Sequence, residues 1–146
     1  MPPGVRRLAA VLGFAVFLGL AGCGGSSQTL DAKALQKQAE AIESLAAEGA
    51  LLAQDVSEGD TTSVFVRVHA EALGKNAETV VAALVPEKAK PGAGLAEQIG
   101  FAHAHAEVVR AELGKLAKSP STGKAASIRD HLEFEAERAR RLAESL

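Results

Sequence analysis

Three breaks divide most of this chain into four segments of nearly equal length, and this division constrains the fold more than any other feature. Each break is rich in the glycine, proline, serine and aspartate residues that end helices and form turns. The breaks fall at residues 57–60, 86–94 and 119–123. The segments between them span residues 30–56, 61–85, 95–118 and 124–146. As helices they would each be roughly 35 to 40 Å long, so we expect four helices of matching length.

Apolar residues recur at helical spacing within these segments, which favours helices over strands. In the first segment, the expected buried stripe contains Leu35, Ala39, Ile42, Leu45, Ala46, Gly49, Leu52, Ala53 and Val56. In the second segment, it contains Phe65, Val66, Ala72, Leu73, Val80, Ala83 and Leu84. In the third segment it contains Leu95, Ile99, Ala102, Ala106, Val109, Leu113 and Leu116, and in the fourth Ile128, Leu132, Ala139, Leu142 and Leu146. Residues 64–68 are largely β-branched, but no partner strand is visible, so we predict helix there as well. Short connections favour antiparallel neighbours, and the sequence therefore predicts an all-α, up-down-up-down four-helix bundle.

The start of the chain has the order of an export signal. Arg6 and Arg7 precede residues 8–20, which carry no charge, and the tetrapeptide Leu-Ala-Gly-Cys occupies residues 20–23. A charged region, a short apolar region and a small-residue cleavage site are typical of such signals. With cysteine at the cleavage position, the pattern resembles the signal peptide and lipobox of bacterial lipoproteins. The resemblance implies cleavage before Cys23 and a lipid, such as palmitate, on its sulfur.

The same resemblance divides the chain into three parts. Residues 1–22 are the expected signal peptide, residues 23–29 are the lipidated cysteine with a flexible Gly- and Ser-rich tether, and residues 30–146 are the helical domain. The lipid would anchor the mature protein in the cell membrane, with the domain on the extracytoplasmic face. More than one acyl chain would make this anchoring stable.

Three other interpretations of the first 23 residues explain less. A membrane-spanning helix needs about 20 apolar residues, whereas the uncharged run has 13. An ordinary secretory signal would not explain why Cys23 stands at the cleavage position. A disulfide would have to be intermolecular, because the chain has no second cysteine.

The expected mature protein is mildly acidic and poor in aromatic residues. Without residues 1–22 it has 14 Lys and Arg against 18 Asp and Glu, a formal charge of −4. Nucleic acids and anionic lipids select basic surfaces, so neither is an expected partner. The chain has no Trp or Tyr, and Phe65, Phe101 and Phe134 are the phenylalanines that remain. This scarcity argues against a stacking platform for bases or sugars and against an aromatic binding hot spot.

Polar side chains interrupt the expected apolar stripes. Gln38, His69, Asn76 and Glu135 lie on or near them. A buried polar group without a partner costs about 1–3 kcal/mol, so we expect these four residues to form a hydrogen-bonded network inside the bundle. The alternatives are that the helices are rotated from this assignment or that His69 faces solvent.

A metal site is the second interpretation of these polar positions. The candidate ligands are His69, His105, His131 and Glu135, because imidazole and carboxylate groups together bind divalent metals. His131 and Glu135 have the i,i+4 spacing that places two side chains on one face of a helix. Most pairs with this spacing are ordinary surface contacts, and no cofactor other than a divalent metal is expected.

No catalytic motif is present in the sequence. It lacks a Gly-rich phosphate loop, a Gly-x-Ser-x-Gly elbow, an HExxH zinc motif, a haem-attachment motif and the Glu-x-x-His motif of di-iron bundles. The sequence therefore predicts a non-enzymatic lipoprotein that acts as a binding or protein-interaction module. The alternative function is that of a small metal-binding four-helix bundle.

Overall fold

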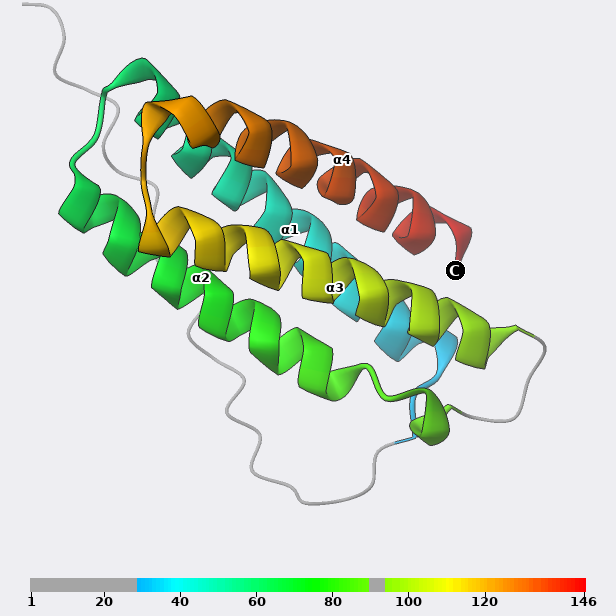
Figure 1. The fold of residues 1–146 in the computed structure, drawn as a ribbon. Helices are drawn as coiled ribbons and strands as arrows, with labels where there is room; N and C mark the ends of the chain where they lie inside the picture. Colours follow the sequence, from blue (N-terminus) through cyan, green and yellow to red (C-terminus); the bar gives the residue numbers. More distant parts are fainter. Residues whose placement is uncertain (1–28, 90–93) are drawn as a thin grey trace, which may run out of the picture.

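The computed structural model describes residues 29–89 and 94–146, and this part of the chain is a bundle of helices (Figure 1). Its helices are α1 (Ala32–Glu58), α2 (Ser63–Ala83), the short 3-10 helix η1 (Pro86–Lys88), α3 (Leu95–Lys118) and α4 (Thr122–Ser145). The predicted all-α fold is confirmed, including the helix over residues 64–68. The predicted signal peptide and Cys23 lie outside the described residues. None of the described helices combines the length and the apolar composition needed to cross a membrane.

Capping residues explain where α1 begins and ends and where α2 begins. Oδ1 of Asp31 accepts a hydrogen bond from the backbone N–H of Ala34 at the start of α1 (2.9 Å). The C-cap of α1 is Gly59, whose φ of 78° lies in the left-handed region that glycine tolerates. Thr62 then caps α2, its Oγ1 accepting from the backbone N–H of Phe65 (3.3 Å). The first break in the sequence is therefore a helix stop followed at once by a helix start.

Aliphatic side chains fill the space between the helices. α1 packs most extensively against α4, and α2 against α3. At Gly49 of α1, an added Cβ would lie 2.7 Å from Cδ2 of Leu113 and 3.0 Å from Cδ1 of Leu132. Glycine at this position therefore allows α3 and α4 to approach α1 closely.

The predicted buried stripes match α1, α3 and α4, but that of α2 is wrong in part. Every residue of the α1 stripe is buried. In α2, Phe65 and Ala72 are exposed, and the buried stripe instead includes Ala70 and Ala77. Alanine at these positions lets α2 approach its neighbours closely, and the large Phe65 ring is left on the outside.

Candidate functional site

Two polar side-chain pairs cross from one described helix to another, and both join α3 to α4. In the first pair, Nδ1 of His105 is hydrogen-bonded to Oε2 of Glu135. The side chains are 11% and 9% exposed, so the pair is largely shielded from solvent. His105 lies at the border of the buried stripe of α3 and Glu135 lies on that of α4, which is why the two meet.

In the second pair, the carboxylate comes from α3 and the imidazole comes from α4. Glu112 of α3 accepts a hydrogen bond from Nδ1 of His131 of α4 (3.3 Å) and another from Nζ of Lys115 (2.7 Å). Glu112 and Glu135 are the buried charged residues of the described chain, and no buried side-chain nitrogen or oxygen there lacks a hydrogen-bond partner. Each helix thus contributes one imidazole and one carboxylate. The His105–Glu135 pair is shielded from solvent on both sides, whereas in the second pair Glu112 is buried and the His131 side chain is 60% exposed.

The four candidate metal ligands are not gathered at one place. His69 lies against Phe65, with the ring centroids 4.5 Å apart and the planes inclined by 25°. His131 contacts Glu112 rather than Glu135. Within the described ranges, no group of three or more His, Cys, Asp or Glu side chains is arranged to hold a metal ion. Of the predicted ligand set, the structure brings together His105 and Glu135.

The four residues of the predicted core network are not brought together either. Asn76 is exposed on α2, and Gln38 and His69 are half-buried. Glu135 takes its hydrogen bond from His105 on α3. The physical reason is the orientation of α2, whose buried stripe runs through Ala70 and leaves Asn76 in solvent.

A groove lies on the surface beside the buried His105–Glu135 pair. It is lined by Phe101, Phe134, Glu137, Arg138, Arg141, Leu142 and Ser145. We call it the α3–α4 groove. Phe101 is 40% exposed and Phe134 is 56% exposed. The Phe101 ring also meets the His105 ring edge-on, with centroids 4.2 Å apart, so the aromatic surface is in direct contact with the buried polar pair.

Arg138 connects the two aromatic rings of this groove. Its Cζ atom lies 5.1 Å from the ring centroid of Phe101 and 5.2 Å from that of Phe134. Both distances are within the range of cation–π attraction. The guanidinium group is therefore held by one ring from α3 and one ring from α4.

The other two arginines near the end of α4 are engaged by Glu137. Arg141 donates to Oε1 of Glu137 (2.9 Å) and Arg140 donates to its Oε2 (2.6 Å). The hydrogen bond from Arg141, followed by that from Arg140, lowers the pKa of Glu137, so this carboxylate is ionised at neutral pH. Arg138, in contrast, forms no ion pair with any described residue.

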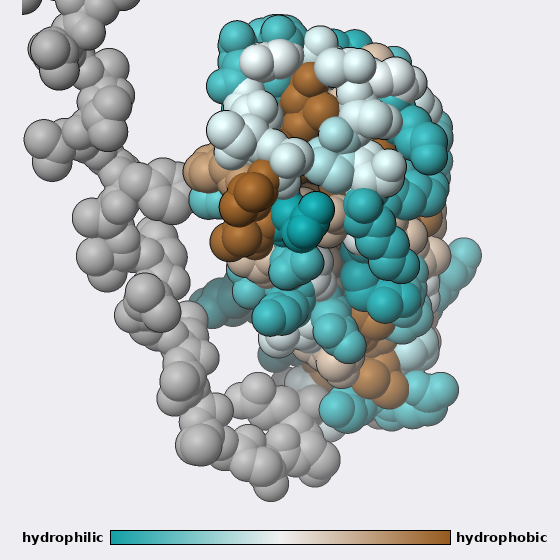
Figure 2. Space-filling view, turned by 60° about the vertical axis from the view of Figure 1, so that its left-hand side comes forward, coloured by the Kyte–Doolittle hydropathy of each residue, from teal (hydrophilic) through white to brown (hydrophobic). Residues whose placement is uncertain are grey.

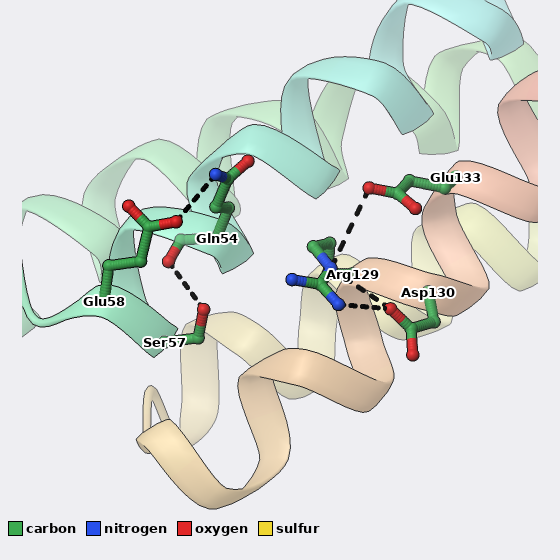
Figure 3. Close-up of polar contacts among 6 residues, drawn as sticks. All are labelled: Gln54, Ser57, Glu58, Arg129, Asp130 and Glu133. Carbon is green, nitrogen blue, oxygen red and sulfur yellow. Dashed lines mark hydrogen bonds and ion pairs between the residues drawn. The ribbon is translucent and has the colours of Figure 1, made fainter.

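Polar contacts near the C-terminal end of α1 and the N-terminal half of α4 stay within each helix (Figure 3). In α1, Nε2 of Gln54 donates to Oε1 of Glu58 (2.7 Å). In α4, Arg129 donates to Oδ1 of Asp130 (2.7 Å) and lies 3.8 Å from Glu133. The hydrogen bond to Asp130 raises the pKa of Arg129. These contacts do not tie α1 to α4.

Sequence reasoning missed Glu112, Phe134 and Arg138 as members of this site. A signal for Glu112 was present, because it follows His105 by seven residues and therefore shares its helix face. A signal for Arg138 was present too, since it follows Phe134 by four residues, a spacing that places a cation beside an aromatic ring.

Comparison of the chain with family models, curated proteins and solved structures gave no match. The function of the interface between α3 and α4 is therefore inferred from the side chains that form it. It combines two polar pairs that cross between helices, each with a buried carboxylate, with a groove flanked by exposed aromatic rings. We take this interface as the candidate functional site.

Proposed function

We propose that this chain is a lipid-anchored, extracytoplasmic helical bundle that binds a protein partner and performs no catalysis. The observation that carries the proposal is the exposure of its phenylalanines. Phe65, Phe101 and Phe134 are 48%, 40% and 56% exposed, while the core is aliphatic. Burying a Phe side chain fully contributes about 1.5–3 kcal/mol to stability, and this fold forgoes much of that contribution at all three positions. Exposed aromatic groups beside a groove are typical of binding surfaces.

Other apolar groups also interrupt the hydrophilic surface, as Figure 2 shows for one face. The large exposed apolar residues are Leu51, Val64, Phe65, Val68, Phe101, Val108 and Phe134. Among these positions, Phe101 and Phe134 alone line the α3–α4 groove and flank a cation. We therefore favour the α3–α4 groove as the binding face.

The lipobox-like sequence supports a role at a membrane surface. Seven residues, 23–29, separate the expected lipid from the folded domain, which limits the tether to about 25 Å. The domain begins directly after it, where the backbone N–H of Leu30 donates to the carbonyl oxygen of Lys88 (2.8 Å). A partner in the same membrane would meet this domain at high effective concentration.

We further infer the up-down-up-down antiparallel topology for the bundle. Support comes from the two crossing pairs, because the α3 residues advance from His105 to Glu112 while their α4 partners retreat from Glu135 to His131. The sequence colours along the four helices of Figure 1 are consistent with alternating directions. Short connections between helices of similar length favour the same arrangement.

Intact-mass measurement of the native protein extracted from membranes tests the lipid anchor. We expect a chain that begins at Cys23 and carries acyl mass. The Cys23→Ala variant should keep residues 1–22 and lack the acyl mass. An unprocessed, unacylated wild-type chain starting at Met1 would overturn the anchor.

Photo-crosslinking in intact cells tests the binding function. The photoreactive residue p-benzoylphenylalanine replaces Phe65, Phe101 or Phe134, one position at a time, in the full chain. The control position is Thr79, which is exposed on α2. We expect at least one of the three positions to give a reproducible protein adduct that the control lacks. If all three match the control, the chain is not an interaction module.

A further inference from the structure

We propose that the α3–α4 groove receives an acidic, amphipathic helix of the partner protein, and that Arg138 binds a carboxylate of that helix. This inference rests on the proposed function and specifies the chemistry of the partner. It follows from three properties of the groove: its walls are apolar, its cation Arg138 is held between two rings, and its carboxylate Glu137 is bonded to other arginines.

The walls of the groove are apolar on both sides. Phe101 stands on α3 and Phe134 on α4, and both rings remain partly open to solvent. Leu142, which is 9% exposed, also lines the groove. A groove between two helices with apolar side chains on each side matches the apolar face of a third helix.

The cation in the groove is held between two aromatic rings. Arg138 has its guanidinium carbon about equally distant from the two rings, at 5.1 and 5.2 Å. A planar guanidinium has its N–H donors in its own plane and binds carboxylates with two parallel hydrogen bonds. Because the rings already restrict this side chain, binding would cost little additional side-chain entropy.

The groove cannot neutralise this cation with its own carboxylate. Glu137 is the acidic residue of its lining, and it accepts hydrogen bonds from Arg140 and Arg141. Arg138 has no carboxylate partner in the described part of the chain. The groove is thus locally basic, although the expected mature protein carries a formal charge of −4. Charge complementarity therefore selects a partner that presents an acidic group.

A second copy of the chain and the bilayer itself fit the groove less well. Two identical grooves placed face to face would bring Arg138 of one chain near Arg138 of the other, and like charges repel. A bilayer offers a broad surface, whose shape does not match a groove that lies between two helices. An acidic helix satisfies both the shape and the charge.

Photo-crosslinking from position 134 in the full-length lipoprotein tests the proposal. In intact cells, p-benzoylphenylalanine in place of Phe134 should give a protein adduct. Its crosslinked peptide should contain Asp or Glu at helical spacing from apolar residues. Adding Arg138→Gln should lower the adduct yield about tenfold, the factor expected for one charge-assisted contact. Arg138→Lys should give an intermediate yield, and the control Arg129→Gln should leave it unchanged. Circular dichroism spectra of the purified variants should match that of the parent chain.

Several results would overturn the inference while leaving the binding function intact. A protein adduct from position 65 but none from position 134 would place the partner elsewhere. An adduct from position 134 that is unchanged by Arg138→Gln, or that contains no acidic residue, would refute the charge argument. Adducts at position 134 with phospholipid or with a second copy would identify a different occupant. If neither position 65 nor position 101 nor position 134 gives a protein adduct, the proposed function falls as well.

Discussion

The two sides of α4 are built by different means. Toward α1, contact is apolar and close, with small residues such as Gly49 allowing the helices to approach, and the described polar side chains pair within their own helices. Toward α3, two carboxylates are buried and each is bonded to a histidine across the interface. Helix α4 therefore packs against α1 through apolar contacts, and it is joined to α3 by hydrogen bonds between specific side chains.

This difference explains how a core of alanine and aliphatic residues defines a single register. A buried polar contact between helices can fix their register, whereas purely apolar packing specifies register less strictly. A shift of α3 along α4 would separate His105 from Glu135 and Glu112 from His131 together. It would leave the buried Glu135 carboxylate without its histidine, whereas Glu112 would keep its hydrogen bond from Lys115 of the same helix. We therefore expect stability to depend mainly on the apolar contacts, and the alignment of the groove residues to depend on the two polar pairs.

The largest expected effect is on the free energy of unfolding, and it should differ between a core residue and a groove residue of α4. Leu132→Ala removes a fully buried side chain and should lower the free energy of unfolding by about 2–5 kcal/mol. Phe134→Ala, two residues away, removes an exposed ring and should change it by less than about 1 kcal/mol. Urea denaturation followed by circular dichroism measures both. Equal losses would show that the aromatic surface is part of the core.

A double-mutant cycle measures how strongly α3 and α4 are coupled. For His105→Ala and Glu135→Ala, the coupling in the free energy of unfolding should be about 1–3 kcal/mol, because the pair is buried. The matched control is Glu107 with Arg110, an exposed pair within α3, whose coupling should stay below about 0.5 kcal/mol. Similar couplings for both pairs would contradict the distinction between the two kinds of contact.

Two glycine substitutions test the close approach of α1 to its neighbours. Gly49→Ala introduces a Cβ 2.7 Å from Cδ2 of Leu113 and should reduce the free energy of unfolding by about 1 kcal/mol. Gly74→Ala meets nothing within 4 Å and should raise it by about 0.5–1 kcal/mol, because alanine favours the helix. Thermal unfolding of the two variants would refute the argument if Gly49→Ala were the more stable.

The smallest expected effect is the titration of Glu137. Its pKa should lie below the ordinary value of 4.5, because Arg141 and then Arg140 donate to the charged carboxylate. The stabilisation from these pairs is therefore present above the ordinary pKa and is lost as the pH falls through the lowered pKa. Carbon-13 NMR of the side-chain carboxyl group measures the midpoint, which Arg141→Gln and Arg140→Gln should each raise. A wild-type midpoint at or above 4.5 would rule out these hydrogen bonds.

The helices and most of the core could be predicted from the sequence because they depend on local signals. Helix-breaking residues marked the ends, and the repeats of Leu35, Ile42 and their neighbours marked the buried faces. The orientation of α2 could not be read in this way, since its alanines on one side and Phe65 on the other made the apolar stripe too broad to assign.

The candidate site was only partly predictable because its partners come from different helices. His105 and Glu135 were both recognised as polar residues near buried faces, but helical spacing says nothing about which residues of two separate helices meet. His131 was associated with Glu135 of its own helix, whereas its carboxylate partner is Glu112 of α3. The scarcity of aromatic residues argued against an aromatic surface, yet Phe101 and Phe134 both line the groove.

Hydroxyl-radical footprinting of the native protein tests most directly the proposal that the α3 side of α4 is the binding face. Oxidation of exposed side chains is compared in intact membranes and after purification in detergent. The account predicts that Phe101 and Phe134 are oxidised several-fold less in the membranes, while Leu51, which is 63% exposed on α1, reacts equally in both. Protection of Leu51 with no protection of the two phenylalanines would contradict it.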